Sequence, residues 1–204
     1  MPSKLQSKYI QATILLLGAI SGTILVFWGG SNFVTANTPE PKESTLAVDM
    51  YLFLTIEGET SGNFEGDVTE AGKEGFIECI TYQHSVVSPR DAASGLPTGK
   101  RQHKPFVITK AIDKATPLLY QACATNENLL NVTLYFYRQT ILGAEENYFT
   151  IRLENAHIAS MQTYMPPDPY DRPTEQVAFV YEKIIWTHEI AGLESSDTWM
   201  AADT

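Results

Sequence analysis

Residues 132–137 read Val-Thr-Leu-Tyr-Phe-Tyr, and apolar side chains occupy every second position of this stretch. In an extended chain, successive side chains point to opposite faces. One face of the stretch therefore collects Val132, Leu134 and Phe136. The other face collects Thr133, Tyr135 and Tyr137. This period of two predicts a strand, because the apolar positions of a helix recur every three or four residues.

The same alternation appears on both sides of this stretch, in residues 50–56, 76–87, 149–154 and 177–186. In the last segment, one face should carry Val177, Phe179, Tyr181 and Ile185, and the other face Ala178, Val180, Glu182, Ile184 and Trp186. Glycine, proline and asparagine separate the segments, as they do in sheets of short antiparallel strands. The pattern predicts a mainly β domain, either an antiparallel barrel or a sandwich.

Residues 113–124 interrupt the alternation and predict one short flanking helix. Thr116 is placed to cap its N-terminus, and Pro117 suits the first turn of a helix. Its apolar stripe would be Leu118, Leu119, Ala122 and Cys123.

The N-terminal region has a different composition, and residues 1–34 form a hydrophobic leader. Its apolar run, Ile10–Trp28, is long enough to cross a bilayer as a helix and follows two lysines. The run could be a transmembrane anchor that contacts a membrane, a signal-like segment, or a buried helix, and translation could also start further downstream. Residues 35–46 contain Pro39 and Pro41 and predict a linker, so the β domain should span residues 47–204.

The overall composition excludes several classes of protein. The 204 residues carry 24 acidic and 14 basic side chains, a formal net charge of −10, which argues against a nucleic-acid binder. Two cysteines are too few for a disulfide scaffold or a cysteine-rich zinc module. We expect Cys79 and Cys123 to be buried free thiols, since a pairing would need an oxidising compartment.

Residues 85–105 have little periodicity, and their charge is opposite to that of the rest of the domain. From Arg90 to Lys114 there are six basic and two acidic residues. A positive arm on a negative body suits head-to-tail self-association, although a solvated loop with ordinary surface charge explains the pattern equally well. An acidic tract is either a solvated face or a docking surface for this arm; its residues are Glu57, Glu59, Glu65, Asp67, Glu70, Glu74 and Glu78.

No catalytic, cofactor or metal site is predicted. The run Gly95–Lys100 has too few residues for a phosphate loop, and Arg101 stands where that motif needs serine or threonine. His188-Glu189 lacks the second histidine of a zinc protease, and the four histidines are not spaced as metal ligands. A hydrolytic arrangement between His84 and Asp91 lacks any motif that would position a nucleophile.

Several motifs of the domain resemble the haemolysin-coregulated protein (Hcp) family of type VI secretion. The most specific are residues 84–91, HSVVSPRD, and residues 95–105, GLPTGKRQHKP. The resemblance continues through residues 108–110, 112–114 and 116–120, and later through residues 158–160, 164–166 and 177–184. It begins at residues 47–50, followed by an apolar strand and Glu57-Gly58-Glu59.

This resemblance implies a small antiparallel β-barrel-like domain with one flanking helix and a structural, non-enzymatic role. Family members form hexameric rings that stack into a secreted tube. A contractile sheath drives the tube, effector proteins ride in its lumen, and a spike protein sits at its tip. By resemblance, the residues of ring assembly and stacking would be Ser88, Pro89, Arg90, Asp91, Gly95, Lys100, Arg101, His103 and Lys104 of the arm. The resemblance separately singles out the helix segment, with Asp113, Lys114, Thr116 and Pro117. The hydrophobic leader departs from the family and leaves open an inner-membrane-anchored or periplasmic binding protein that no longer builds the tube.

Overall fold

A computed structural model describes residues 50–140, 143–165 and 172–199, all within one unit of the chain, Val48–Thr204. Its elements in chain order are β1 (Met50–Gly58), β2 (Gly62–Asn63), β3 (Ile77–Gln83), β4 (Val86–Val87), β5 (Gln102–His103), β6 (Phe106–Ala111), α1 (Thr116–Thr125), β7 (Leu129–Gln139), β8 (Glu145–Tyr164), β9 (Thr174–His188) and β10 (Leu193–Thr198).

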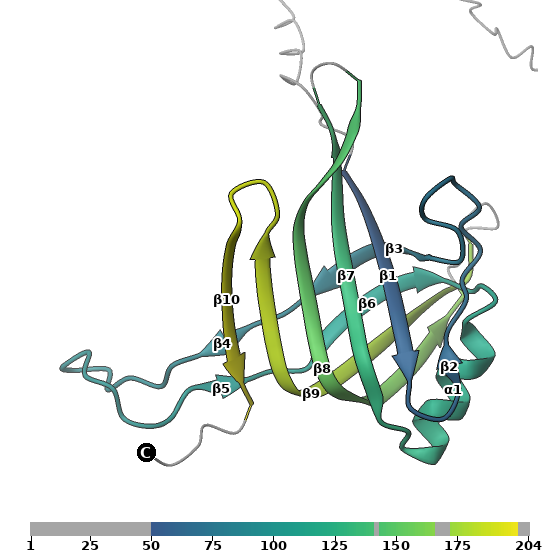
Figure 1. Ribbon diagram of the computed structural model, residues 1–204. Helices are drawn as coiled ribbons and strands as arrows, with labels where there is room; N and C mark the ends of the chain where they lie inside the picture. Colours follow the sequence, from purple (N-terminus) through teal and green to yellow (C-terminus); the bar gives the residue numbers. More distant parts are fainter. Residues whose placement is uncertain (1–49, 141–142, 166–171, 200–204) are drawn as a thin grey trace, which may run out of the picture. The chain divides into compact units, whose positions relative to one another are not determined.

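Six of the strands close into an antiparallel barrel. Their order is β9-β6-β3-β1-β7-β8, and the pairing of β8 with β9 closes the circle. One edge of β9 is shared, since β6 pairs with Thr174–Phe179 and β10 pairs with Lys183–His188. Figure 1 shows the tall strands β7, β8 and β9 beside one another, with α1 at one end of the barrel. The mainly β prediction is confirmed, and of the two predicted architectures the barrel is correct.

The barrel core is built from the alternating positions that the sequence indicates. Val132, Leu134 and Phe136 are all buried, and they belong to the same core cluster as Leu54 and Ile56 of β1. Phe53 is also buried although it points to the opposite face, because residues 64–76 fold over the outside of β1 at this point. Both faces of β1 are therefore buried at this point.

The alternation changes phase within the paired strands β8 and β9, at Asn155. Leu153 and Ala156 are both buried core residues, although they are three positions apart. Their partners in β9 are Ile184 and Tyr181, and these are also both in the core. Between them, Asn155 adopts a left-handed backbone with φ of 49°, which reverses the alternation. The prediction that Ile184 and Tyr181 point to opposite faces of β9 is therefore wrong.

Two element boundaries also differ from the predictions. The strand expected to reach Val87 ends at Gln83, and Val86–Val87 forms a separate strand, β4. The helix begins at Thr116, and Ala115 is its N-cap without a side-chain hydrogen bond. Thr116 is not the cap, because its hydroxyl is engaged in a buried polar network. The predicted apolar stripe is confirmed, with Leu119 and Ala122 buried, and with Leu118 and Cys123 packed against the core.

The predicted hydrophobic leader (1–34), its apolar run Ile10–Trp28 and the linker (35–46) lie outside the described residues. Within residues 50–140, 143–165 and 172–199, α1 is too short to cross a membrane, and no other helix there is long and apolar enough to do so.

Candidate assembly surface

The arm, defined here as residues 85–104, is a hairpin that stands off the barrel (Figure 1). Its two sides pair through β4 and β5, with Val86 opposite His103 and Val87 opposite Gln102. An isolated bridge joins Arg90 to Pro97 further out. The segment was expected to have little regular structure, and the structure shows instead that it carries its own short ladder.

The tip of the arm is an organised turn. Asp91 accepts hydrogen bonds at Oδ1 from the backbone N–H of Ser94, at 2.7 Å, and of Ala93, at 3.2 Å. The hydroxyl of Ser94 also donates to Asp91, and this bond is the main reason that the pKa of the Asp91 carboxyl is below its ordinary value. Arg90 donates to the carbonyl oxygen of Gly95, which has a φ of +70°. A turn that is already ordered loses little entropy when it binds a partner.

The base of the arm is fixed to the barrel by a chain of polar contacts that we name the arm-base cluster. It consists of His84, Arg101, His103, Tyr181 and Asp197. Arg101 forms an ion pair with Asp197 of β10. His103 is buried between Asp197 and Tyr181, so it holds the arm in place and does not face solvent.

The remaining arm residues that the sequence singled out are placed on the surface. Ser88, Arg90, Asp91, Gly95, Lys100, Arg101 and Lys104 are exposed, and Pro89 is half-buried. From Ser88 to Lys104 the arm has four basic residues and one acidic residue. The arm is therefore an exposed cationic projection on an acidic protein.

The residues predicted in the helix segment do not join the arm. Figure 1 shows α1 and the arm on opposite sides of the barrel. Asp113 and Thr116 lie in a buried network, Pro117 is exposed, and Lys114 is exposed and pairs with Asp67 at 3.5 Å. The two groups of predicted residues thus belong to two separate surfaces of the subunit.

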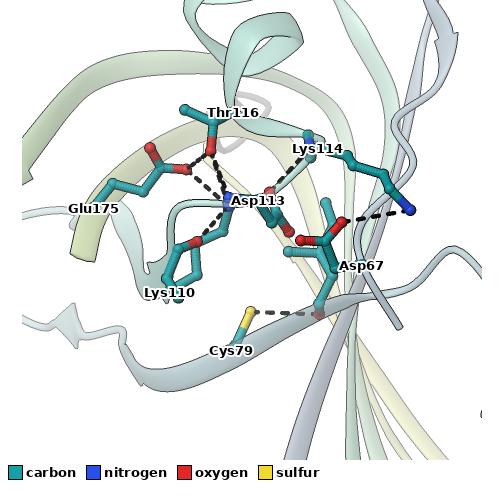
Figure 2. A network of polar contacts seen from close by, with 10 residues as sticks. Asp67, Cys79, Lys110, Asp113, Lys114, Thr116 and Glu175 are labelled. Atoms are coloured by element: carbon teal, nitrogen blue, oxygen red, sulfur yellow. Dashed lines mark hydrogen bonds and ion pairs between the residues drawn. The ribbon is translucent and has the colours of Figure 1, made fainter. Parts of the chain in front are cut away.

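Lys110 is the centre of the buried network, which Figure 2 shows from close by. Its Nζ lies 2.6 Å from Asp113 Oδ1 and donates to the carbonyl oxygen of Ala111 at 2.9 Å. Thr116 donates to Glu175 Oε1 at 2.9 Å, and this bond links the start of α1 to β9. Lys110 therefore does not add to the positive charge of the arm, as its place in the sequence had indicated, since its charge is neutralised inside the fold by Asp113 and Glu175. The alternation Phe106, Ile108, Lys110 is the sequence signal that places it on the core face.

The acidic tract lies on the outer face of the barrel, where residues 64–76 fold over β1. Backbone bonds hold this loop down, including Phe64 N–H to the oxygen of Ile56 at 3.0 Å. Beneath the loop, Lys73 is buried against the rings of Phe53 and Tyr137, 4.6 and 4.5 Å from their centroids. Burial lowers the pKa of Lys73, but hydrogen bonds and charges from Glu145 and Glu70 outweigh it, so the pKa is raised overall.

Between this loop and strands β1 and β7 lies a groove of about 430 Å³ that we name the acidic groove. Three carboxylates line it, from Glu57, Glu65 and Glu74, and all three residues are exposed. The basic residue that lines it is Arg152 of β8. The structure thus gathers three members of the acidic tract around one concave surface, which suits a cationic partner.

The described residues do not bring together the side chains of a metal site or of the imagined hydrolytic site. Nowhere in residues 50–140, 143–165 and 172–199 do three or more His, Cys, Asp or Glu side chains come together as metal ligands. His84 and Asp91, imagined as part of a hydrolytic site, are separate, because Asp91 orders the tip turn and His84 bonds Tyr181 at the base. Cys79 is buried, Cys123 is partly buried, and both are free thiols.

Comparison with known proteins gives one consistent result. Residues 53–188 match the family described as "Type VI secretion system effector, Hcp". The chain is 42% identical over 151 residues to the "Major exported protein" of Pseudomonas aeruginosa, an alignment that covers 72% of this chain and 88% of that protein.

Solved structures agree with this match. A crystal structure of an Hcp protein has a TM-score of 0.69 and 34% identity, covering 73% of this chain and 99% of that one. The Hcp1 protein of the E. coli EAEC 042 pathovar has a TM-score of 0.68 and 32% identity, with coverage of 74% and 100%. Secreted protein Hcp3 of Pseudomonas aeruginosa has a TM-score of 0.63 and 32% identity, with coverage of 75% and 100%.

Proposed function

The chain belongs to the Hcp family of type VI secretion system effectors, and from this premise we propose that it is a tube subunit that assembles head to tail into stacked hexameric rings and is exported. The observation that carries the proposal is the placement of its charged surfaces. A cationic arm projects from the barrel, and an acidic groove lies on the barrel wall, so each copy offers a surface that another copy can complement. Rings and tubes need such unlike, head-to-tail contacts, whereas a two-fold dimer needs a self-complementary one.

We assign the arm residues from Ser88 to Lys104 to the contact with a neighbouring copy, with Arg101 and His103 holding the base. The acidic groove is the surface that we propose for the arm's charges. Exposed ion pairs are each worth at most about 1 kcal/mol, but every copy in a ring or stack repeats them. A contact of this kind assembles cooperatively and weakens as salt is added.

Further partners follow from family membership. We propose effector proteins in the lumen, a spike protein at the tip and a contractile sheath around the tube, with export through the type VI apparatus. We also keep as a proposal the division into a leader (1–34), a linker (35–46) and a barrel domain (47–204). The role is structural, and the packed positions of His84 and His103 support this over hydrolysis.

The test is charge reversal on the arm, measured as oligomer mass by light scattering. The double variant Lys100→Glu/Lys104→Glu should lose rings or stacks while its subunit stays folded. Arg101 is left intact because its ion pair with Asp197 anchors the arm. The matched control is Arg172→Glu, which reverses an exposed charge outside the arm and should leave assembly unchanged.

Reversing the charge of the acidic groove as well gives a stricter test. Adding Glu57→Lys and Glu74→Lys to the arm variant should restore part of the assembly, since the two surfaces are again opposite in charge. If the arm variant assembles like the wild type, the arm has no role in the contact. If the arm variant fails and groove reversal does not restore assembly, the arm docks elsewhere.

A further inference from the structure

The arm-base cluster joins four parts of the chain around one tyrosine. Tyr181 Oη of β9 lies 2.7 Å from His84 Nε2, just after β3, and 2.9 Å from His103 Nδ1 of β5. His103 Nε2 lies 3.1 Å from Asp197 Oδ2 of β10. The two imidazole rings are 6.3 Å apart between centroids. Both imidazole rings are thus connected through the one hydroxyl group of Tyr181.

With both histidines neutral, only one arrangement of hydrogens satisfies these bonds. Asp197 is a carboxylate that can only accept, so His103 donates to it from Nε2 and must accept at Nδ1. Tyr181 therefore donates its one hydrogen to His103, and His84 donates from Nε2 to Tyr181. The pKa of Tyr181 is raised, chiefly by burial and then by the charge of Asp197, so the hydroxyl keeps its hydrogen.

One added proton can be accommodated. If His103 is protonated it donates from both nitrogens, and the Tyr181 hydroxyl turns to donate to His84, which accepts at Nε2. The new charge then faces the carboxylate of Asp197. All three bonds survive: the two bonds of Tyr181 reverse their direction, and the bond from His103 to Asp197 keeps its own.

A second proton cannot be accommodated. Both imidazoles would then donate to Tyr181, leaving its own hydrogen with no acceptor in the cluster and placing two cations on either side of one hydroxyl. The pKa of His84 is accordingly below its ordinary value, first because of burial and then because of the charge of His103.

The other groups around the two rings do not offset this second charge. Arg101 is cationic and is already paired with Asp197. Burial raises the pKa of Asp197, but the hydrogen bonds that it accepts, above all from Arg101, and the charge of Arg101 outweigh burial, so the pKa is lowered and the carboxylate form is favoured. The remaining neighbours are aromatic: Phe106, Trp186 and Trp199. Among the described residues, no further charged side chain makes an ion pair or hydrogen bond with either imidazole.

We propose that the arm-base cluster is a proton-operated clamp, which holds both ends of the arm on the barrel while at most one of His84 and His103 is protonated and releases the end next to His84 when both are. Release follows because His84 directly precedes the arm and would lose its bond to Tyr181, which frees that end of the hairpin. Arg101 and His103 still hold the β5 end on Asp197. For a tube, this release predicts that the assembly loosens in acid, a consequence that rests on the function proposed above. The release itself is a property of the single subunit.

The experiment is hydrogen–deuterium exchange of the full-length protein, comparing the wild type with His84→Gln at each pH. Glutamine can donate to Tyr181 but cannot take up a proton, so the variant never reaches the doubly charged state. Comparison at equal pH removes the intrinsic dependence of exchange on pH for residues 86–104. At about pH 7.5 the two proteins should protect the arm equally, and at about pH 4.5 the wild-type arm should exchange on the order of tenfold faster.

His188→Gln is the matched control, because His188 is exposed at the far end of β9, and this variant should behave like the wild type. Protection of β7 in every sample shows that the barrel remains folded. Equal arm exchange in wild type and His84→Gln at about pH 4.5 would overturn the clamp. Oligomer mass is measured on the same samples: arm release without disassembly would uphold the clamp and overturn the role proposed for the arm in the tube.

Discussion

Lys110 Nζ lies 2.8 Å from Glu175 Oε1, and both side chains are completely buried. The contact joins β6 to β9 across 65 residues of sequence and, through Asp113 and Thr116, fixes the start of α1. A buried charge pair is costly to break, because the partner left behind keeps its desolvation penalty without compensation.

We therefore expect Lys110→Met to lower the free energy of unfolding by about 3–5 kcal/mol, measured by urea denaturation. The control is Lys114→Met, four residues further on, which loses only an exposed pair with Asp67 and should cost less than about 1 kcal/mol. Adding Glu175→Gln to Lys110→Met should recover part of the loss. Equal costs for the two lysine variants would contradict the network's role.

Gly66 lies near the start of the loop (residues 64–76) that covers β1. Because it has no side chain, it can approach the backbone of Phe76 at the other end of this loop. A Cβ at this position would lie 2.3 Å from the backbone oxygen of Phe76, a distance that no relaxed structure allows. Gly66→Ala should therefore destabilise the protein by about 1–3 kcal/mol and loosen the loop that covers Phe53. Gly99→Ala is the control, since its Cβ would meet Pro89 only at 3.9 Å. Thermal unfolding of both variants would settle the point, and a Gly66→Ala protein as stable as Gly99→Ala would refute it.

The two cysteines should differ sharply in reactivity. Burial raises the pKa of Cys79 to about 12, so almost none of it is the reactive thiolate at neutral pH, and the side chain is also inaccessible. Cys123 is partly exposed on α1. A thiol-specific reagent should modify Cys123 in the native protein and reach Cys79 only after unfolding. Mass spectrometry of the labelled peptides identifies the site, and labelling of native Cys79 at a comparable rate would disprove the expectation.

Glu127 should make stability depend on pH in the acid range. It accepts hydrogen bonds from the backbone of Ser61 at 2.7 Å and of Thr60 at 2.9 Å, and from the Ser61 hydroxyl at 2.8 Å. Burial raises the pKa of Glu127, but these bonds outweigh it and the pKa is lowered. The stabilisation is therefore complete above the unfolded pKa, about 4.5, and is lost as the pH falls through the lower folded value.

Glu127→Gln should accordingly be less stable than the wild type at neutral pH, and the difference should shrink below about pH 4.5. Urea denaturation at a series of pH values measures it. A difference that stays constant into acid would mean that the carboxylate charge contributes nothing to the fold.

The features that could be predicted from the sequence are those that depend on residues close together in the chain. The alternation in residues 132–137 and the apolar stripe of α1 appear in the structure as expected, because each depends only on neighbouring positions. The phase change at Asn155 could not be read from the sequence, since a left-handed residue inside two long paired strands leaves their apolar composition unaltered. Ile184 was assigned to the wrong face for this reason.

The polar residues were harder to place, because their partners are distant in sequence. Lys110 was counted with the charges of the arm, because its partner Glu175 is distant in the sequence. His103 was grouped with exposed arm residues, and only the return of β9 and β10 brings Tyr181 and Asp197 to it. The cationic character of the arm itself needed no partner to be recognised, and it was predicted from composition alone.

Closure of the barrel sets a limit on how copies of this protein can join. Each of the six barrel strands has a neighbour on both sides, so among the described residues the open edge of this sheet is the outer side of β10, which pairs with β9 alone. On the barrel itself, contacts between copies must then be made by side chains and projecting loops. Subunits joined in this way can associate and separate repeatedly without any backbone hydrogen bond of the barrel being exchanged, which favours a reversible polymer over a β-fibril.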